Sequence, residues 1–299
     1  MPSLASPPRW SLPDPHTASG CFETMRAYDG RLFRLEAHLK RLYASAQYLG
    51  LTIPMRPEAL GTQLRKHLAA SRLRNAVVRV ALIPACAPDA SLCFAKRRKA
   101  SGASRPNTRR VVAPSIVVQT IKPPPASSYR RGIRVATVPT RRFPVSQIDP
   151  QTKFSARLGS VQAVTEAHLR RADEAVFMDG LGSVTESTAS NLGVIKDGVC
   201  LLPPCWLGLL AGITWQVLEE AAQTLNIPVH QHPLTRHDLY NADEVFLTST
   251  IKEVLPVTDI DGRCIGSGRP GPYTKRLHRA FRQVVQRELR LHRIADGGR

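Results

Sequence analysis

The stretch ADEAVFMDGLGSVTESTASNLGVIKDGVCLL, residues 172–202, decides the fold of this chain. EAVFMD and NLGVIKDGVCLL are rich in apolar and β-branched residues, which predicts strands, and Asp197-Gly198 is a dipeptide that closes tight β-turns. Between these strands, residues 185–191 gather small hydroxyl side chains around one acid, Glu186. The stretch therefore predicts short strands with a polar cluster between them, although an ordinary turn has a similar composition.

Outside this stretch, strands and helices are mixed along the chain. Asp29-Gly30 lies between two short apolar runs and predicts a hairpin over 21–33, and leucines at three- and four-residue spacing predict helices after it. The further predicted strands are 76–84, 115–121, 133–139 and 244–249, and the predicted helices are 35–49, 57–72, 156–170, 213–226 and the basic C-terminal 275–299. Because strands and helices do not alternate strictly, the predicted fold class is α+β in two domains.

The domain boundary is predicted from a proline run. The segment KPPPASSY, residues 122–129, contains three consecutive prolines, which can continue neither a helix nor a central strand. We therefore expect a small N-terminal domain over 1–121, a linker over 122–130 and a larger C-terminal domain over 131–299. The chain shows no internal repeat and neither of the glycine-rich phosphate loops GxGxxG and GxxxxGKS/T.

Composition excludes several classes of protein. The 299 residues are 42% apolar with a mean hydropathy of −0.19. No apolar run approaches the roughly 18 residues that a transmembrane helix needs. Six cysteines show no CxxC or Cys/His spacing, so neither a disulfide scaffold nor a metal site is expected. Residues 1–16 contain five prolines and no apolar segment, unlike a secretory signal, so we expect a cytoplasmic protein that contacts no membrane.

The net charge is strongly positive, at +19, from 42 Lys and Arg against 23 Asp and Glu. Most of the excess lies in two segments, 96–110 and 275–299. The first is typical of a Ser/Gly/Pro loop and the second of an amphipathic helix. Neither carries the interleaved aromatic residues or the groove-reading element that nucleic-acid binding needs. We therefore expect solvated basic surfaces and no nucleic-acid partner.

Three further features carry chemistry, each weakly when taken alone. Lys153 precedes a predicted helix in a segment of low charge, where a solvated lysine is equally at home. Gly212-Ile213-Thr214 opens a helix after a glycine and leaves backbone N–H groups that suit a phosphate. Thr248-Ser249-Thr250 follows a strand and offers hydroxyl groups, as many structural turns do.

The order of these features resembles that of a known family. FETMRAYDGRLFRLEAHLKRL at 22–42, Lys153, ADEAVFMD with VTESTASNLGVIKDG, LLAGIT, and ADEVFLTST follow one another as in the class IV aminotransferases. These are fold-type IV pyridoxal-phosphate enzymes, and they include branched-chain and D-amino-acid transaminases and 4-amino-4-deoxychorismate lyase. The resemblance covers about 21–80 and, more closely, 130–285. It implies a small N-terminal domain, a larger C-terminal domain, pyridoxal phosphate in the cleft between them, and a homodimer.

The resemblance also assigns roles to residues. Pyridoxal phosphate needs a protein amine to bond to, and Lys153 matches the family's lysine. Its ring nitrogen must stay protonated beside a carboxylate, and Glu186 matches that acid. Its phosphate needs a cation and converging donors. The residues that match these phosphate ligands are Arg41, Ile213, Thr214, Ser249 and Thr250.

The positions after Lys153 indicate the subfamily. Branched-chain transaminases carry Asn-Tyr at the fourth and fifth positions, where this chain has Arg157-Leu158. Arg-Leu resembles the aminodeoxychorismate lyases, although a leucine at the fifth position also occurs in D-amino-acid transaminases. We therefore expect a lyase that yields 4-aminobenzoate and pyruvate for folate synthesis, with a branched-chain or D-amino-acid transaminase as the alternative. A non-catalytic basic binding protein is a more distant alternative, motivated by the charge of +19.

Two arginines are candidates for binding the carboxylate of an amino-acid-like substrate. On a helix, Arg157 would lie at i+4 from Lys153 and so on the same face. Arg79, in AVVRV, matches a place where the family often has a basic residue near the substrate. A solvent-facing position is the alternative for both. Residues 1–20 and 86–112 depart from the family's pattern, and so does Trp215, where an arginine is usual.

Overall fold

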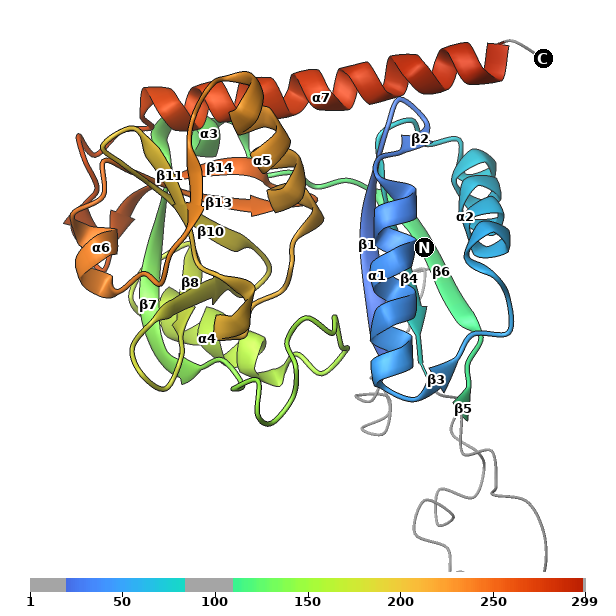
Figure 1. Cartoon of the computed structure of the whole chain (residues 1–299), viewed down its shortest axis with the longest axis horizontal. Helices are drawn as coiled ribbons and strands as arrows, with labels where there is room; N and C mark the ends of the chain where they lie inside the picture. The colour runs from blue at the N-terminus through green and yellow to red at the C-terminus, as the bar shows by residue number, and fades with distance from the viewer. Residues whose placement is uncertain (1–19, 84–109, 298–299) are drawn as a thin grey trace, which may run out of the picture.

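The computed structural model describes residues 20–83 and 110–297 (Figure 1). Apart from their last residues, the coil predicted for 1–20 and the basic segment 96–110 therefore lie outside the described residues, as does most of the atypical stretch 86–112. Two sheets organise the rest of the chain, one of four strands and one of nine. In Figure 1 they stand side by side, with the last helix running along the top of both.

The smaller sheet has the strand order β2-β1-β4-β6. Its strands are β1 (Cys21–Tyr28), β2 (Arg31–Leu32), β4 (Ala76–Leu82) and β6 (Pro114–Thr120), and its helices are α1 (Leu35–Tyr48) and α2 (Pro57–Ser71). Every second residue of β1 is buried, and these residues share a core with the leucines of α1 and α2. A short pair, β3 (Leu51–Thr52) with β5 (Arg110–Val111), lies beside this unit. The predicted hairpin and both helices are thus confirmed.

The larger sheet closes on itself. Along the order β10-β13-β14-β7-β8-β9, the last strand pairs again with β10, so these strands form a barrel. They are β7 (Ile133–Arg141), β8 (Glu174–Met178), β9 (Val184–Ser187), β10 (Asn191–Lys196), β13 (Glu244–Ser249) and β14 (Glu253–Ile260). The pair that closes the ring is Glu186 opposite Asn191. Closure therefore places two polar residues where β9 and β10 meet.

Further strands and helices surround this barrel. The strands are β11 (Val199–Leu202), β12 (Val229–Gln231) and β15 (Arg263–Cys264). The helices are α3 (Ala126–Arg131), α4 (Leu158–Leu169), the 3₁₀ turn η3 (Cys205–Leu207), α5 (Ile213–Thr224), α6 (Arg236–Tyr240) and α7 (Pro272–Gly297). The apolar faces of α5 and α7 enclose one core with β10, β11 and β13, and Trp215 is buried in it. No helix of the described ranges is long and apolar enough to cross a membrane.

Two local expectations were wrong. Residues 184–187 form strand β9, because they pair with β8 and β10, whereas they were expected in a turn. The helix expected at 156–170 begins at Leu158, and the chain around Lys153 is extended instead. There it pairs with the smaller sheet: Phe22 N donates to Lys153 O at 3.0 Å, and Ser155 N to Gly20 O at 2.7 Å. Residues 126–131, within and beside the expected linker, form α3, and the domain boundary itself stays a prediction.

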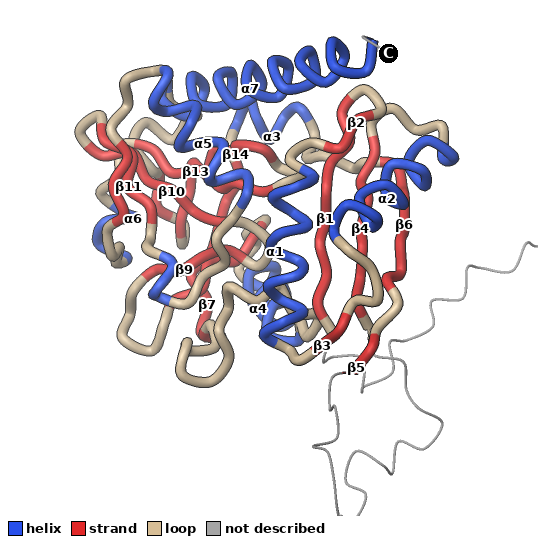
Figure 2. The backbone as a smooth tube through the Cα atoms, turned by 45° about the vertical axis from the view of Figure 1, so that its right-hand side comes forward, coloured by secondary structure: helices blue, strands red, loops and turns tan. Residues whose placement is uncertain are grey.

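A buried charge cluster joins the smaller sheet to the barrel and to α7. Glu253 is fully buried and accepts hydrogen bonds from Arg26 at 2.6 Å, Tyr28 at 3.0 Å, His278 at 2.7 Å and Arg282 at 2.8 Å. Burial alone would raise the pKa of Glu253, but His278 and the arginines lower it to about 2. The carboxylate therefore stays ionised and fixes β1, β14 and α7 relative to one another. Both views show α7 lying over the two sheets (Figures 1 and 2).

Candidate active site

One cavity of about 440 Å³ lies between the smaller sheet and the barrel. The smaller sheet contributes Phe22 and Thr24, which alternate along β1 with the buried Glu23. The barrel contributes the ends of β9, β10 and β13 and the start of α5. All the residues proposed for the site from the sequence line this cavity: Arg41, Arg79, Lys153, Arg157, Glu186, Ile213, Thr214, Ser249 and Thr250. The structure thus brings them together, and their individual roles stay predictions.

Lys153 is held in the cavity by its backbone. Its carbonyl pairs with β1, and its N–H donates to Ser45 Oγ at 3.2 Å. Burial lowers the pKa of Lys153 to about 8, and the positive charges of Arg41 and Arg157 add to the effect against the opposing charge of Glu23. At pH 7 roughly a tenth of such an amine is neutral, against far less than a hundredth for an ordinary lysine. The environment therefore makes Lys153 a nucleophile and a proton acceptor near neutral pH.

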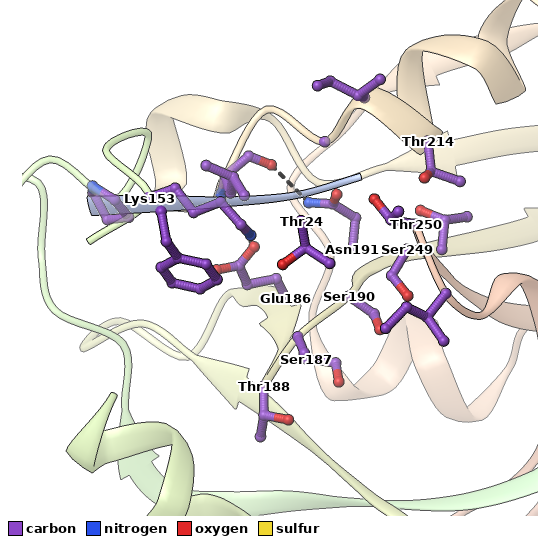
Figure 3. Close-up of a pocket in the computed structure, with 18 of the residues that line it drawn as sticks. Thr24, Lys153, Glu186, Ser187, Thr188, Ser190, Asn191, Thr214, Ser249 and Thr250 are labelled. Atoms are coloured by element: carbon purple, nitrogen blue, oxygen red, sulfur yellow. Dashed lines mark hydrogen bonds between the residues drawn. The ribbon is translucent and has the colours of Figure 1, made fainter. Parts of the chain in front are cut away.

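Glu186 extends from β9 into the same cavity as Lys153 (Figure 3). One of its oxygens forms an ion pair with Arg142 at 2.6 Å, and the other accepts a hydrogen bond from Leu210 N at 3.1 Å. Sequence reasoning missed Arg142, which follows the end of β7. The pair Arg141-Arg142 shortly ahead of a proline was a visible signal, but only the folded chain shows which arginine turns inward.

Arg41 is oriented by a buried acid that the sequence analysis also missed. Glu23 accepts hydrogen bonds from Arg41 Nε at 2.6 Å and Nη2 at 3.0 Å, and His38 Nδ1 lies 2.7 Å from the same carboxylate. Burial alone would raise the pKa of Glu23, but Arg41 and His38 lower it well below its usual range. Arg41 Nη1 also donates to Ala211 O at 2.7 Å. These bonds hold the guanidinium rigidly at the cavity wall.

The opposite end of the cavity is built from hydroxyl and backbone donors. Gly212 precedes α5 and no side chain caps the N-terminus of that helix, so the N–H groups of Ile213 and Thr214 remain available. A Cβ at Gly212 would overlap Asn191 Oδ1, and Asn191 in turn donates to Leu210 O at 2.8 Å. Figure 3 shows Thr214, Ser249 and Thr250 together here, away from Lys153. This end has the features of a phosphate site.

Buried hydroxyls test whether a polar group fits the cavity. Among the described residues, Ser187, Ser190 and Thr248 line it and have buried side-chain oxygens without a hydrogen-bond partner. Buried polar atoms are rarely left unsatisfied in proteins. Because these atoms border the donor-rich end, the cavity suits a ligand that carries its own polar groups, and pyridoxal phosphate meets that requirement.

Arg79 and Arg157 gather with Lys153 around the ring of Phe22. The distances from the ring centre are 5.1 Å to Lys153 Nζ, 5.8 Å to Arg79 Cζ and 6.0 Å to Arg157 Cζ. Arg157 does not share a helix face with Lys153, because α4 begins after it; it donates instead to the carbonyl of Thr188. Leu158 points away from the cavity and is 80% exposed.

A third cation at the cavity has a partner within the barrel. Lys252 forms an ion pair with Glu174, which also accepts a hydrogen bond from Thr188 Oγ1 at 2.6 Å. Its charge is thereby neutralised, unlike those of Arg79 and Arg157, for which no ion pair occurs within the described residues. No cluster of His, Cys, Asp or Glu in the ranges 20–83 and 110–297 could hold a metal ion.

Comparison with known proteins agrees with this geometry. The model of the family Amino-transferase class IV matches residues 20–260. The chain belongs to the class IV aminotransferases. A putative branched-chain-amino-acid aminotransferase of Methanocaldococcus jannaschii is 37% identical, over 89% of this chain and 86% of that protein. A D-alanine aminotransferase of Bacillus licheniformis is 32% identical, over 90% and 88%.

Solved structures of class IV aminotransferases share the whole architecture. A branched-chain amino acid aminotransferase of the organism abbreviated T.th., solved with pyridoxamine 5'-phosphate, superimposes with a TM-score of 0.80 at 29% identity, covering 94% of this chain and 91% of that one. The enzyme of Thermoproteus uzoniensis, solved with norvaline, gives 0.76 at 29% identity, covering 89% and 85%. The predicted α+β fold-type IV architecture is confirmed. So are the assignment of this class IV aminotransferase as an enzyme and of pyridoxal phosphate as its cofactor.

The expected subfamily fares differently. The similar proteins are aminotransferases, so they support the transaminase alternative better than aminodeoxychorismate lyase. The preference for a lyase rested on Arg157-Leu158 as one motif. In the structure the two side chains part: Arg157 lines the cavity, and Leu158 is exposed on α4. Only the arginine can therefore bear on the reaction.

Proposed function

We propose that this class IV aminotransferase transfers the amino group of an α-amino acid with a branched apolar side chain to a 2-oxo acid. The observation that supports it best is the division of the cavity into two anion-binding ends, with Lys153 beside one of them. Hydroxyl and N–H donors from α5 and β13 form one end, and Arg79 and Arg157 form the other, around Phe22. The relatives named above as branched-chain enzymes favour this class of amino acid.

The proposed division of labour follows from the two ends. The donors of Ile213, Thr214, Ser249 and Thr250 would bind the cofactor's phosphate, with Arg41 supplying positive charge. When bound, pyridoxal phosphate supplies an aldehyde that takes up an amine and a ring that withdraws electrons from the amine's α-carbon. Glu186, fixed by Arg142, would keep a proton at the ring nitrogen.

Lys153 would bind the cofactor and then move the proton. A group with a pKa of about 8 can accept a proton from the α-carbon at Nζ and return it near neutral pH. Arg79 and Arg157 would bind carboxylate groups of the amino acid and the oxo acid, since neither has an ion-pair partner among the described residues. Phe22 and Phe154 would contact the apolar side chain.

One assay separates the candidate reactions. Enzyme loaded with pyridoxal phosphate is incubated with 2-oxoglutarate and L-leucine, L-isoleucine or L-valine, and glutamate is measured. Parallel mixtures contain D-alanine, or aminodeoxychorismate with 4-aminobenzoate measured. Glutamate from the branched-chain amino acids supports the proposal. Turnover of D-alanine alone moves the function to D-amino-acid transfer, and 4-aminobenzoate without glutamate restores the lyase.

The role of Lys153 has its own test. Borohydride reduction of the loaded enzyme should attach the cofactor permanently to the peptide that contains Lys153, as mass spectrometry would show. Lys153→Ala should lose this attachment and all activity, whereas Lys66→Ala, which removes an exposed lysine of α2, should keep both. Attachment to another peptide would show that Lys153 is wrongly assigned.

We further propose that the protein is a homodimer and that residues 122–130 separate two domains. Light scattering should give twice the chain mass of 32.9 kDa, and a clean monomer would contradict the dimer. Limited proteolysis should cut first within 122–125, ahead of α3. First cuts within β7 or β6 would contradict this boundary.

A further inference from the structure

A second cavity, of about 570 Å³, lies at the other end of α4 from the active site. It is lined by the start of β7, the residues that follow α4, helix α6 and the turn between β14 and β15. Figure 1 shows these elements gathered on the barrel, on the side away from the smaller sheet. Helix α4 starts after Arg157 and ends at Arg170, so its 12 residues, about 18 Å long, separate the two cavities.

The walls of this second cavity concentrate positive charge. Five arginines from separate parts of the sequence converge on it, and all are exposed: Arg134, Arg170, Arg171, Arg236 and Arg263. Within the part of the chain that the structure describes, none of them forms an ion pair. Arg26, Arg34, Arg41, Arg142 and Arg282, by contrast, all have carboxylate partners. Like charges that face one cavity repel one another, so this arrangement costs free energy unless an anion is present.

The acids of the same cavity do not neutralise these arginines. Asp261 accepts hydrogen bonds from Thr137 N at 2.8 Å, Thr137 Oγ1 at 2.7 Å and Tyr240 Oη at 2.8 Å. Asp259 accepts one from Gly262 N at 3.0 Å. Both carboxylates therefore hold the cavity's backbone in shape. The floor of the cavity is rigid, and the charged guanidinium groups stand around it.

We infer that this cavity binds a small ligand with two or more linked phosphate groups. Guanidinium groups bind phosphate oxygens in pairs, which favours phosphate where several arginines converge. Two acids against five arginines leave an excess of positive charge that a single carboxylate would not balance. Arg263 stacks over the ring of Tyr240 at 4.4 Å, which gives the site a flat wall as well as charge. The volume of about 570 Å³ suits a compact molecule.

The experiment uses the enzyme loaded with pyridoxal phosphate, so that its own phosphate site is filled. Inorganic pyrophosphate is titrated into it by calorimetry at physiological salt. We expect saturable binding of one pyrophosphate per chain, with orthophosphate binding more weakly. The double variant Arg134→Ala/Arg236→Ala should raise the Kd at least about tenfold, because it removes two charge-assisted partners.

A matched control separates a built site from general positive charge. Arg56→Ala/Arg269→Ala removes the same charge from exposed arginines that do not line the cavity, and its Kd should stay within about twofold of the wild type. Absence of saturable binding, or equal weakening in both double variants, would overturn the inference. So would tighter binding of duplex DNA than of pyrophosphate, lost in the first variant, because the ligand would then be a nucleic-acid backbone.

Discussion

Replacing Glu23 by glutamine should weaken both the fold and the cofactor site. Glu23 is fully buried and receives two hydrogen bonds from Arg41 and one from His38. Glutamine keeps the shape but offers one acceptor instead of two and places an amide N–H group against the guanidinium. Breaking a buried ion pair by removing one partner costs about 3–5 kcal/mol.

The expected change in melting temperature follows from the size of the chain. With an unfolding entropy of about 2.1 cal/mol/K per residue, a chain of 299 residues loses about 5–8 °C for that cost. Calorimetry at pH 7 measures it. Because the pKa of Glu23 is lower in the folded state than its ordinary value of 4.5, this stabilisation is present above pH 4.5. It is lost as the pH falls toward the folded-state pKa, so the two melting curves should converge in acid.

The same variant should change the titration of Lys153. After burial, the negative charge of Glu23 is the largest influence on the pKa of Lys153, and it raises that pKa. Removing the charge should shift the pKa below about 8. The rate at which the cofactor-free enzyme takes up pyridoxal phosphate, measured against pH, should then reach its plateau at lower pH than in the wild type.

Glu36→Gln is the matched control. Glu36 also lies on the smaller domain and pairs with Arg65 at 3.1 Å, but both side chains are largely exposed. Such surface pairs contribute less than about 1 kcal/mol, so the melting temperature should change by less than about 2 °C. If Glu23→Gln melted as closely to the wild type as this control does, and left the titration of Lys153 unchanged, the reasoning about a buried, positioning carboxylate would be refuted.

Other predictions address separate parts of the molecule. Uptake of pyridoxal phosphate by the wild-type apoenzyme should rise with pH and level off above about pH 8, as neutral Lys153 accumulates; a midpoint near 10 would contradict its burial. Gly212→Ala should displace Asn191 and weaken cofactor binding at least about tenfold, seen by equilibrium dialysis, with a smaller effect on melting. Glu253→Gln should cost about 3–5 kcal/mol in denaturant unfolding at pH 7. That loss should shrink between pH 4.5 and about 2, where the wild-type carboxylate itself becomes protonated, and an unchanged difference would count against it. Gly193→Ala should destabilise by about 1–3 kcal/mol, because the new methyl group would overlap the ring of Phe246; an unchanged urea midpoint would contradict this.

Much of the fold was visible in the sequence because its signals are local. The hairpin at Asp29-Gly30, the leucine spacing of α1 and α2 and the apolar runs of β8, β10 and β13 all depend on neighbouring residues. The motif order further indicated which residues share the active site, and the structure places all of them around one cavity. The segment around Lys153 was the exception. Its extended form depends on pairing with β1, more than a hundred residues earlier.

The arrangement of charges was decided by tertiary structure alone. Nothing local distinguishes Glu23, which a strand's alternation turns toward α1, from an exposed acid, or Arg142 from Arg141 beside it. Leu158 and Arg157 are neighbours in sequence, yet the start of a helix sends one to solvent and the other into the cavity. Short-range patterns record backbone preferences, whereas burial and ion pairing depend on which distant segments meet when the barrel closes. The sequence by itself therefore determined the fold class and the members of the site, and only the closed structure determined which charges meet.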